Sequence, residues 1–173
     1  MAHSPDEQGG AGGVNIRAAT ENDQDAIWKI FQTTIAAGDA FVFDANTSRE
    51  KALRYWCAED AATFVAEQNG KVLGSYILRA NQPGLGNHVA NAGFMVDPDA
   101  RGLGVGRAMG KHCLDEARRR GYRAMQFNFV VSTNESAVHL WRQLGFSIVG
   151  TLPGAFRHAQ KGFVDAYVMF RLL

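Results

Sequence analysis

The stretch that most constrains this chain is residues 91–112, NAGFMVDPDARGLGVGRAMGKH. An apolar run ends at Met95-Val96, and Asp97-Pro98-Asp99 stops a strand there, because proline has no N–H to give a sheet. Glycine then recurs through residues 101–106, and a helical pattern follows without a breaker until Gly121. The pattern predicts a strand, a turn, a glycine loop and a helix. A glycine-rich helix N-terminus with unpaired N–H groups is a site for an anion such as a phosphate or pyrophosphate.

Two common phosphate-binding motifs do not fit this loop. A P-loop requires Gly-Lys followed by Ser or Thr, whereas Gly106 is followed by Arg107 and Ala108. A dinucleotide-binding loop has the spacing GxGxxG and an acidic residue after the next strand. Here the spacing is GxGxG, and the next predicted strand ends in Val130-Val131-Ser132. A glycine loop alone is a weak signal, because glycines also serve plain turns.

Two motifs in the expected order carry a resemblance to a known family. The loop matches Arg-x-x-Gly-x-Gly at Arg101, Gly104 and Gly106, which resembles the acyl-CoA-binding motif of the GCN5-related N-acetyltransferases. A second family feature follows downstream as Asn134-x-x-Ala137-x-x-Leu140-Trp141-x-x-x-Gly145-Phe146. Within the family, the chain looks most like the phosphinothricin and azetidine-2-carboxylate (amino-acid) N-acetyltransferases. The segments behind this finer resemblance are HVANAGF at 88–94, FNFV at 127–130 and Thr133-Asn134.

The resemblance implies that acetyl-CoA is the cosubstrate and lies between two parallel strands, residues 89–96 and 124–131, that splay apart. Its pyrophosphate would be held by a loop made of Arg101, Gly102, Leu103, Gly104, Val105 and Gly106. Arg107 and Lys111 would contact phosphate or ribose, or would simply be solvated. A backbone N–H near Met95 or Val96 would polarise the thioester carbonyl in an oxyanion-hole role. Asn134 would bond to the pantetheine, cap the next helix, or do both.

Trp141 is a departure from the family pattern. A tyrosine often stands at this place and protonates the departing thiolate, and an indole N–H is far too weak an acid for that. We therefore expect Trp141 to be a packing wall. Either water or another group protonates the thiolate, or the coenzyme is held differently. The general base is equally open, because no Asp or Glu lies between His88 and Val96. His88 and His158 are candidates by residue type only, and water-mediated deprotonation would suffice for a modestly basic amine.

The acceptor amine has candidate contacts in four residues. Asn91 and Asn128 are amides inside otherwise apolar strands, where an unpaired amide costs free energy. Either each is satisfied by sheet neighbours or buried water, or together they hold the carboxylate and amine of an amino acid. Phe41 and Phe43 lie in an aromatic loop that either packs as a cover or lines the acceptor pocket. We expect one of the two to line the pocket.

The remaining pattern predicts one α/β (α+β) domain over residues 14–173, after a disordered tail at 1–13. Its sheet is mixed and mostly antiparallel, with helices on both faces and a I′ hairpin turn at Asn69-Gly70. Ser48 or Thr47 is expected to begin the second helix. The predicted strands are 14–18, 63–68, 71–79, 89–96, 124–131, 146–150 and 163–172; the predicted helices begin at Thr20 and near residue 48, and span 103–120 and 134–144. Pro153, Gly154, Arg157 and His158 are assigned to the loop between the last two strands.

Composition narrows the class of partner. The 173 residues carry a net charge of +1, so no broad basic field indicates nucleic acid. No apolar run approaches the ~20 residues of a membrane span. Cys57 and Cys113 fall in helical patterns and indicate neither a disulfide scaffold nor a metal site. We expect a cytoplasmic protein without a metal, with a homodimer left open, and a sheet-facing rather than catalytic His112.

Together these features predict an acetyl-CoA-dependent N-acetyltransferase acting on a small-molecule amine, an amino acid or an analogue. A protein or peptide N-acetyltransferase is the competing enzyme reading. A non-catalytic acyl-CoA-binding module is the alternative from another class.

Overall fold

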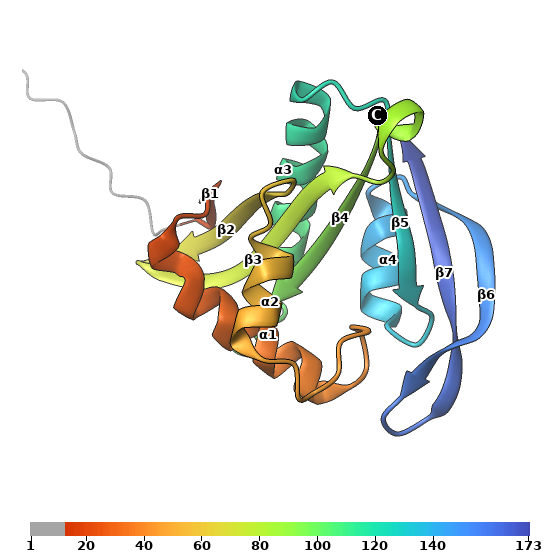
Figure 1. The fold of residues 1–173 in the computed structure, drawn as a ribbon, viewed down its shortest axis with the longest axis horizontal. Helices are drawn as coiled ribbons and strands as arrows, with labels where there is room; N and C mark the ends of the chain where they lie inside the picture. The colour runs from red at the N-terminus through yellow and green to blue at the C-terminus, as the bar shows by residue number, and fades with distance from the viewer. Residues whose placement is uncertain (1–12) are drawn as a thin grey trace, which may run out of the picture.

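The computed structural model describes residues 13–173, so the predicted tail lies, apart from Gly13, outside the described residues. A seven-stranded sheet in the order β1-β2-β3-β4-β5-β7-β6 forms the centre of the molecule (Figure 1). Adjacent strands of the sheet are antiparallel, except that β4 and β5 run parallel. The predicted mixed, mostly antiparallel α/β sheet is confirmed.

The order of the elements along the chain is also as predicted, with three short 3-10 turns added. The strands are β1 Asn15–Ala18, β2 Ala62–Gln68, β3 Lys71–Ala80, β4 Val89–Val96, β5 Ala124–Val131, β6 Ser147–His158 and β7 Gly162–Leu172. The helices are α1 Gln24–Ala37, α2 Arg49–Trp56, α3 Val105–Arg119 and α4 Glu135–Gln143, and the 3-10 turns are η1 Glu21–Asp23, η2 Gly84–Gly86 and η3 Pro98–Ala100.

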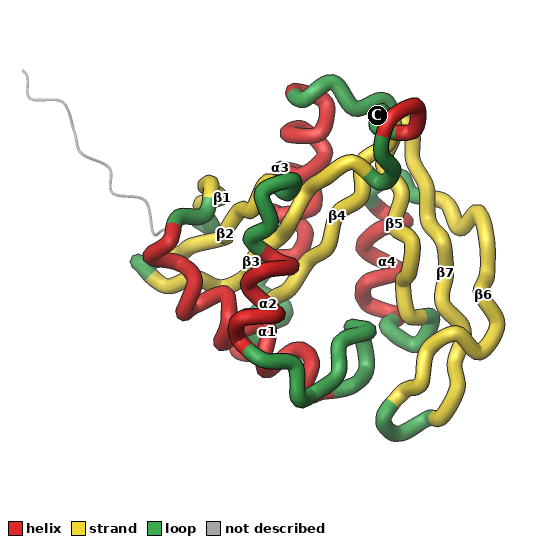
Figure 2. The backbone as a smooth tube through the Cα atoms, viewed as in Figure 1, coloured by secondary structure: helices red, strands yellow, loops and turns green. Residues whose placement is uncertain are grey.

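Helices cover both faces of the sheet (Figure 2). Successive side chains of a strand point to opposite faces, so Tyr76 and Leu78 of β3 pack with α3 and α4, while Ile77 packs with α1 and α2. His112 of α3 faces the sheet, where its Nδ1 lies 2.7 Å from the Tyr76 hydroxyl. The sheet-facing position predicted for His112 is therefore confirmed. β3, which pairs with β4 beside the candidate site, is thus fixed from both sides by apolar packing.

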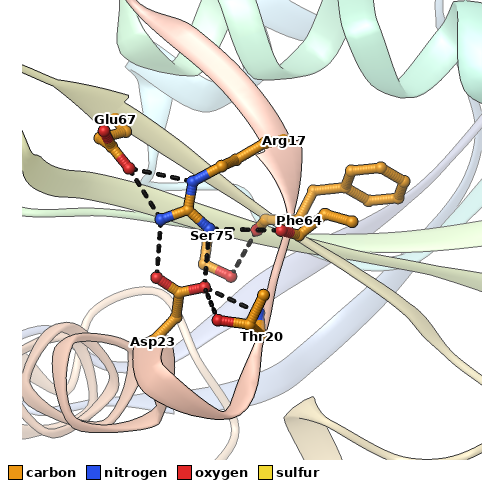
Figure 3. A network of polar contacts seen from close by, with 7 residues as sticks. Arg17, Thr20, Asp23, Phe64, Glu67 and Ser75 are labelled. Carbon is orange, nitrogen blue, oxygen red and sulfur yellow. Dashed lines mark hydrogen bonds and ion pairs between the residues drawn. The ribbon is translucent and has the colours of Figure 1, made fainter.

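An ion-pair network ties the first strand to the start of α1 (Figure 3). The Arg17 guanidinium donates to both carboxylate oxygens of Asp23, at 2.8 and 2.9 Å, and to Glu67 Oε2 at 2.7 Å. The Thr20 N–H donates to Asp23 Oδ2 at 2.7 Å. The hydrogen bonds from Arg17 lower the pKa of Asp23 to about 2, against burial, which acts in the opposite direction. Asp23 is therefore ionised and paired although it is only 5% exposed.

Ser75 links α2 to the sheet in the same region. The Trp56 Nε1–H donates to Ser75 Oγ at 2.8 Å. Ser75 Oγ in turn donates to the Phe64 carbonyl at 2.8 Å (Figure 3). Both Trp56 and Ser75 are fully buried, so each polar atom needs such a partner. These two hydrogen bonds fix the C-terminal end of α2 against β2 and β3. The loop between α1 and α2, which leads to the candidate site, comes directly before this helix.

Two predicted boundaries are wrong. β6 does not end at residue 150 but continues to His158, through the residues assigned to a loop. Pro153 is tolerated because β6 is an edge strand and its pairing with β7 shifts register between Leu152 and Phe156. Cys57 lies just beyond α2 rather than within it, whereas Cys113 is buried in α3 as expected.

Other local predictions hold. Ser48 is the N-cap of α2 and accepts a hydrogen bond from the Lys51 N–H. Asn69 and Gly70 have φ values of 52° and 76°, as a I′ turn requires. Within residues 13–173 no helix is both long and apolar enough to cross a membrane. The cytoplasmic location and the homodimer stay predictions.

Candidate active site

The site begins where the two parallel strands part. β4 and β5 pair only at Val89–Ala124 and Ala90–Met125, and beyond these pairs the ladder ends. β4 continues along β3, and β5 continues along β7, so the two halves of the sheet diverge like a V (Figure 1). Asn91 lies at the fork, where its Nδ2 donates to the Gln126 carbonyl of β5 at 2.9 Å. The predicted splay of strands 89–96 and 124–131 is present.

A cavity of about 250 Å³ occupies the opening between the diverging strands. The loop between α1 and α2 closes one side of it, and α4 contributes another wall. Its wall carries no Asp, Glu, His, Lys or Arg among the described residues. It is lined by Ala40, Phe41, Val42, Phe43, Tyr55, Asn91, Ala92, Gly93, Phe94, Phe127, Asn128, Phe129, Val130, Val131, Asn134, Ala137 and Trp141.

Both aromatic loop residues reach this cavity. Phe43 also packs on Phe31 at 5.1 Å and on Tyr55 at 4.8 Å between ring centroids, and Phe41 packs near Trp56 at 6.1 Å. The loop therefore both packs on the core and lines the cavity. Both phenylalanines line the cavity, whereas the sequence led us to expect only one. Tyr55, on the outer side of α2, was not foreseen as a wall residue, because nothing in the helical pattern marks it.

Trp141 stands at the back of the opening in an aromatic cluster. Its ring lies 4.7 Å from Phe94 of β4 and 4.8 Å from Phe127 of β5, so it bridges the two strands where their ladder has ended. Only 7% of Trp141 is exposed. These contacts agree with the packing wall expected for it.

Asn91 and Asn128 both line the cavity, but they do not bond to each other. Asn128 Nδ2 donates to Asn81 Oδ1 at 2.7 Å, and its own Oδ1 accepts from Gln126 Nε2 at 2.8 Å. Each amide thus has a hydrogen-bond partner in the sheet, as expected if sheet neighbours satisfy it. Each also borders the cavity, as expected if the two amides hold the acceptor. Among the described residues, the contacts of Asn91 use its Nδ2 and leave Oδ1 available to a ligand.

The phase of the β3–β4 ladder separates the two candidates for an oxyanion donor. Asn81 N–H donates to Val89 O, and Asp97 N–H donates to Leu73 O, both at 2.8 Å, at the two ends of β4. Hydrogen-bonded pairs alternate in an antiparallel ladder, so odd-numbered residues of β4 direct their N–H groups at β3. The Met95 N–H is thus directed away from the opening, whereas the Val96 N–H is directed into it.

The glycine loop lies at the N-terminus of α3, on the surface. Gly102 and Gly104 have φ values of 79° and 78°, in the left-handed region where glycine is favoured. The helix's own hydrogen bonds begin with the Ala108 N–H, which donates to Gly104 O at 3.0 Å. The Leu103 N–H donates to Ala100 O, so among the described residues the N–H groups of 104–107 are the ones available to an anion. A Cβ built on Gly104 would meet no atom within 4 Å, whereas one on Gly106 would lie 3.4 Å from Leu140 Cδ2.

The remaining predicted residues divide between the site and the surface. Asn134 caps α4 by accepting from the Ala137 N–H at 3.3 Å and also lines the cavity. Arg107 is exposed and donates to Gln143 of α4, and Arg101 and Lys111 are exposed as well.

Neither histidine proposed as a base by residue type reaches the cavity. His88 is exposed before β4, and His158 accepts from the Gln160 and Lys161 N–H groups in the β6–β7 turn. Residues 13–173 bring together no group of three His, Cys, Asp or Glu side chains that could hold a metal ion.

Comparison with known proteins agrees with this geometry. The model of the acetyltransferase (GNAT) family matches residues 26–146. A GCN5-related N-acetyltransferase structure from Kribbella flavida is 43% identical, with a TM-score of 0.89 over 92% of this chain and 98% of that chain. N-acetyltransferase aca1 of Schizosaccharomyces pombe is 36% identical over 112 residues, which are 64% of this chain but only 54% of that protein. L-amino acid N-acyltransferase MnaT of Escherichia coli is 28% identical over 145 residues, 81% of this chain and 83% of that protein.

The chain belongs to the acetyltransferase (GNAT) family. The structure agrees with this membership in three features: the fold, the splayed pair of parallel strands and the Arg101–Gly106 loop. The predicted family and the predicted class of enzyme, an N-acetyltransferase, are confirmed.

Proposed function

We propose that the protein transfers the acetyl group of acetyl-CoA to the amine of a small molecule, an amino acid or an amino-acid analogue. The observation that carries the proposal is the cavity at the fork of β4 and β5, which amides from both strands and aromatic rings from the α1–α2 loop line together. The name of the E. coli relative, an L-amino acid N-acyltransferase, supports the choice of acceptor.

The residues present suit the coenzyme. The open N-terminus of α3, with two left-handed glycines before it, offers backbone N–H groups for a pyrophosphate, and Arg101 adds a cation. Val105 begins the helix, and its side chain is buried, so only its backbone faces an anion. Asn134 lines the cavity, and the Val96 N–H is directed into the opening between β4 and β5. Acetyl-CoA would supply the activated acetyl thioester there.

The protein's contribution to the reaction is positioning and polarisation. The Val96 N–H is directed to the opening, where it would stabilise negative charge on the thioester oxygen in the transition state. Asn91 and Asn128 would orient the acceptor, which supplies much of the rate when the reacting atoms are held in line. The cavity wall offers no carboxylate or imidazole, so the amine must arrive neutral or lose its proton to water. Trp141 would exclude water behind the reacting groups rather than donate a proton.

A large peptide acceptor is favoured less by this geometry. The loop with Phe41 and Phe43 closes one side of the cavity, and the wall has no acidic residue to attract a basic peptide. Its volume of about 250 Å³ suits an amino acid better than a folded chain.

The test is release of free coenzyme A thiol from acetyl-CoA with glycine, leucine, methionine, phenylalanine, proline and short peptides as acceptors. We expect turnover with at least one free amino acid and none above background with peptides. Turnover with peptides alone would overturn the proposal in favour of a peptide acetyltransferase. Tight acetyl-CoA binding by calorimetry without turnover of any acceptor would indicate a non-catalytic acyl-CoA-binding module.

A further inference from the structure

Arg79 of β3 lies beside the acceptor cavity without being part of its wall. It pairs directly with Asn91 of β4 in the antiparallel ladder. Side chains of such a pair lie on the same face of the sheet, with their Cβ atoms about 5 Å apart. Asn91 lines the cavity, so the stem of Arg79 begins one side chain away from it.

The guanidinium of Arg79 contacts Tyr55, a residue of the cavity wall. Its Cζ lies 4.6 Å from the centre of the Tyr55 ring, and its Nη2 donates to the Tyr55 carbonyl at 3.2 Å. Tyr55 is itself a wall residue, packed against Phe43 at 4.8 Å. A cation held on an aromatic face is oriented by the ring, and it keeps most of its N–H donors for other partners.

The positive charge of Arg79 is poorly balanced for its degree of burial. Its side chain is 19% exposed, and the carboxylate paired with it, Asp60, is 75% exposed and lies 3.9 Å away. Arg17, by contrast, is 37% exposed and has two carboxylates within 2.8 Å. A charge withdrawn from water is stabilised only by close partners, so Arg79 has capacity for a further anion.

We propose that Arg79 is a specificity-determining residue that favours acceptors with a carboxylate next to the reacting amine. This inference rests on the proposed function. It assigns to Arg79 the positive charge that the cavity wall itself lacks. An amino acid whose amine has lost its proton carries a net charge of −1, and the wall around it has no cation. The Arg79 guanidinium, behind Asn91 and Tyr55, would supply the attraction, while the amides of Asn91 and Asn128 set the orientation.

The experiment compares two acceptors in four proteins. The acceptors are the amino acid with the highest kcat/KM among glycine, leucine, methionine, phenylalanine and proline, and its primary amide, which lacks the carboxylate. The proteins are the wild type, Arg79→Gln, Arg79→Lys and Asp60→Asn. We expect Arg79→Gln to lower kcat/KM for the acid about tenfold and to leave that for the amide within twofold. Arg79→Lys should restore part of the loss, and Asp60→Asn should raise kcat/KM for the acid.

Arg49→Gln is the matched control, because Arg49 is 48% exposed on the neighbouring helix α2 and pairs with Asp25 at 2.6 Å, away from the cavity wall. It should leave the ratio of acid to amide unchanged. The amine pKa values of acid and amide differ, but they cancel when the ratio is compared between variants.

The outcomes separate this inference from the proposed function. An equal loss for acid and amide in Arg79→Gln would mean that Arg79 only supports Tyr55, and the inference would be overturned while the proposed function stood. Wild-type protein that acetylates peptides alone, or binds acetyl-CoA without acetylating any acceptor, would overturn the proposed function and the inference with it. Binding of the N-acetylated acid and amide, measured by calorimetry, should show the same dependence on Arg79 as the kinetics.

Discussion

Gly104 offers a direct test of the coenzyme site, because its backbone conformation and its surroundings are both known. With φ at 78°, replacement by alanine places an L residue in the left-handed region, which costs roughly 1–2 kcal/mol. A new Cβ would touch no protein atom within 4 Å, so no steric term adds to this strain. The same methyl group would lie at the N-terminus of α3, where the pyrophosphate is proposed to bind. We expect Gly104→Ala to weaken acetyl-CoA binding ten- to hundredfold.

The size of the effect follows from the bonds at risk. Hydrogen bonds to a charged group contribute about 1.5–3 kcal/mol each, and ~1.4 kcal/mol is a factor of ten in affinity. Displacing the phosphate from one backbone N–H is therefore enough for the expected loss. Calorimetric titration with acetyl-CoA measures it, and thermal unfolding measures the strain separately.

Gly121→Ala supplies the control at the other end of the same helix. Gly121 has a φ of 84°, and a Cβ there would also meet nothing within 4 Å. Both variants should therefore lose similar stability, a few degrees in Tm by the usual scaling for a domain of this size. Only Gly104→Ala should lose affinity. Equal affinity in the two variants, with matched Tm values, would refute the phosphate-loop assignment.

Three further predictions concern the acceptor, the back wall and the fold. Asn91→Ala or Asn128→Ala should lower kcat/KM for the amino-acid acceptor by about 1–3 kcal/mol, with acetyl-CoA affinity unchanged, in steady-state kinetics that vary each substrate separately. Unchanged acceptor kinetics in both variants would exclude an amide pair. Trp141→Phe should reduce kcat by less than about threefold, because the ring packs and donates no proton; a collapse of kcat in a folded variant that binds acetyl-CoA would contradict this. Asp23→Asn should lower the free energy of unfolding at pH 7 by about 2 kcal/mol, since the Asp23 pKa falls from 3.8 to about 2 on folding. That contribution is present above about pH 4 and is lost as the pH falls through about 2, so urea unfolding of wild type and variant should converge in acid.

Much of the fold was readable from local patterns. The strands at 89–96 and 124–131 have the predicted boundaries, because each is a mostly apolar run, interrupted by amide residues and ended by a turn or a proline. The Asn69-Gly70 turn was readable because few residues tolerate its dihedral angles. The extent of β6 was not, since Pro153 marks a loop in most contexts and is compatible with a strand only at an edge. Which strand lies at the edge is a property of the whole sheet.

The candidate site divides in the same way. The glycine loop, Asn91 and Asn128 stand out in the sequence, because glycine and asparagine are unusual in those patterns, and Asn134 was found through the family motif. The choice between Met95 and Val96 depends on the phase of the β3–β4 ladder, which alternates residue by residue and leaves no trace in composition. Arg79 and Tyr55 meet only because α2 packs over β3, so the place of Arg79 behind a wall residue of the cavity could not be predicted from either segment alone.

The order of the strands also determines when the cavity can exist during synthesis. β5 has only two paired residues on β4, and it depends on six pairs with β7, whose residues 162–172 leave the ribosome after every other element. Strands β2, β3 and β4 can pair early, because they follow one another in the chain. The second wall of the cavity must wait for a contact between distant segments, which is slow to form. A chain stopped before residue 162 would keep the first half of the sheet, lose the partner of β5, and expose Phe127 and Trp141 to aggregation.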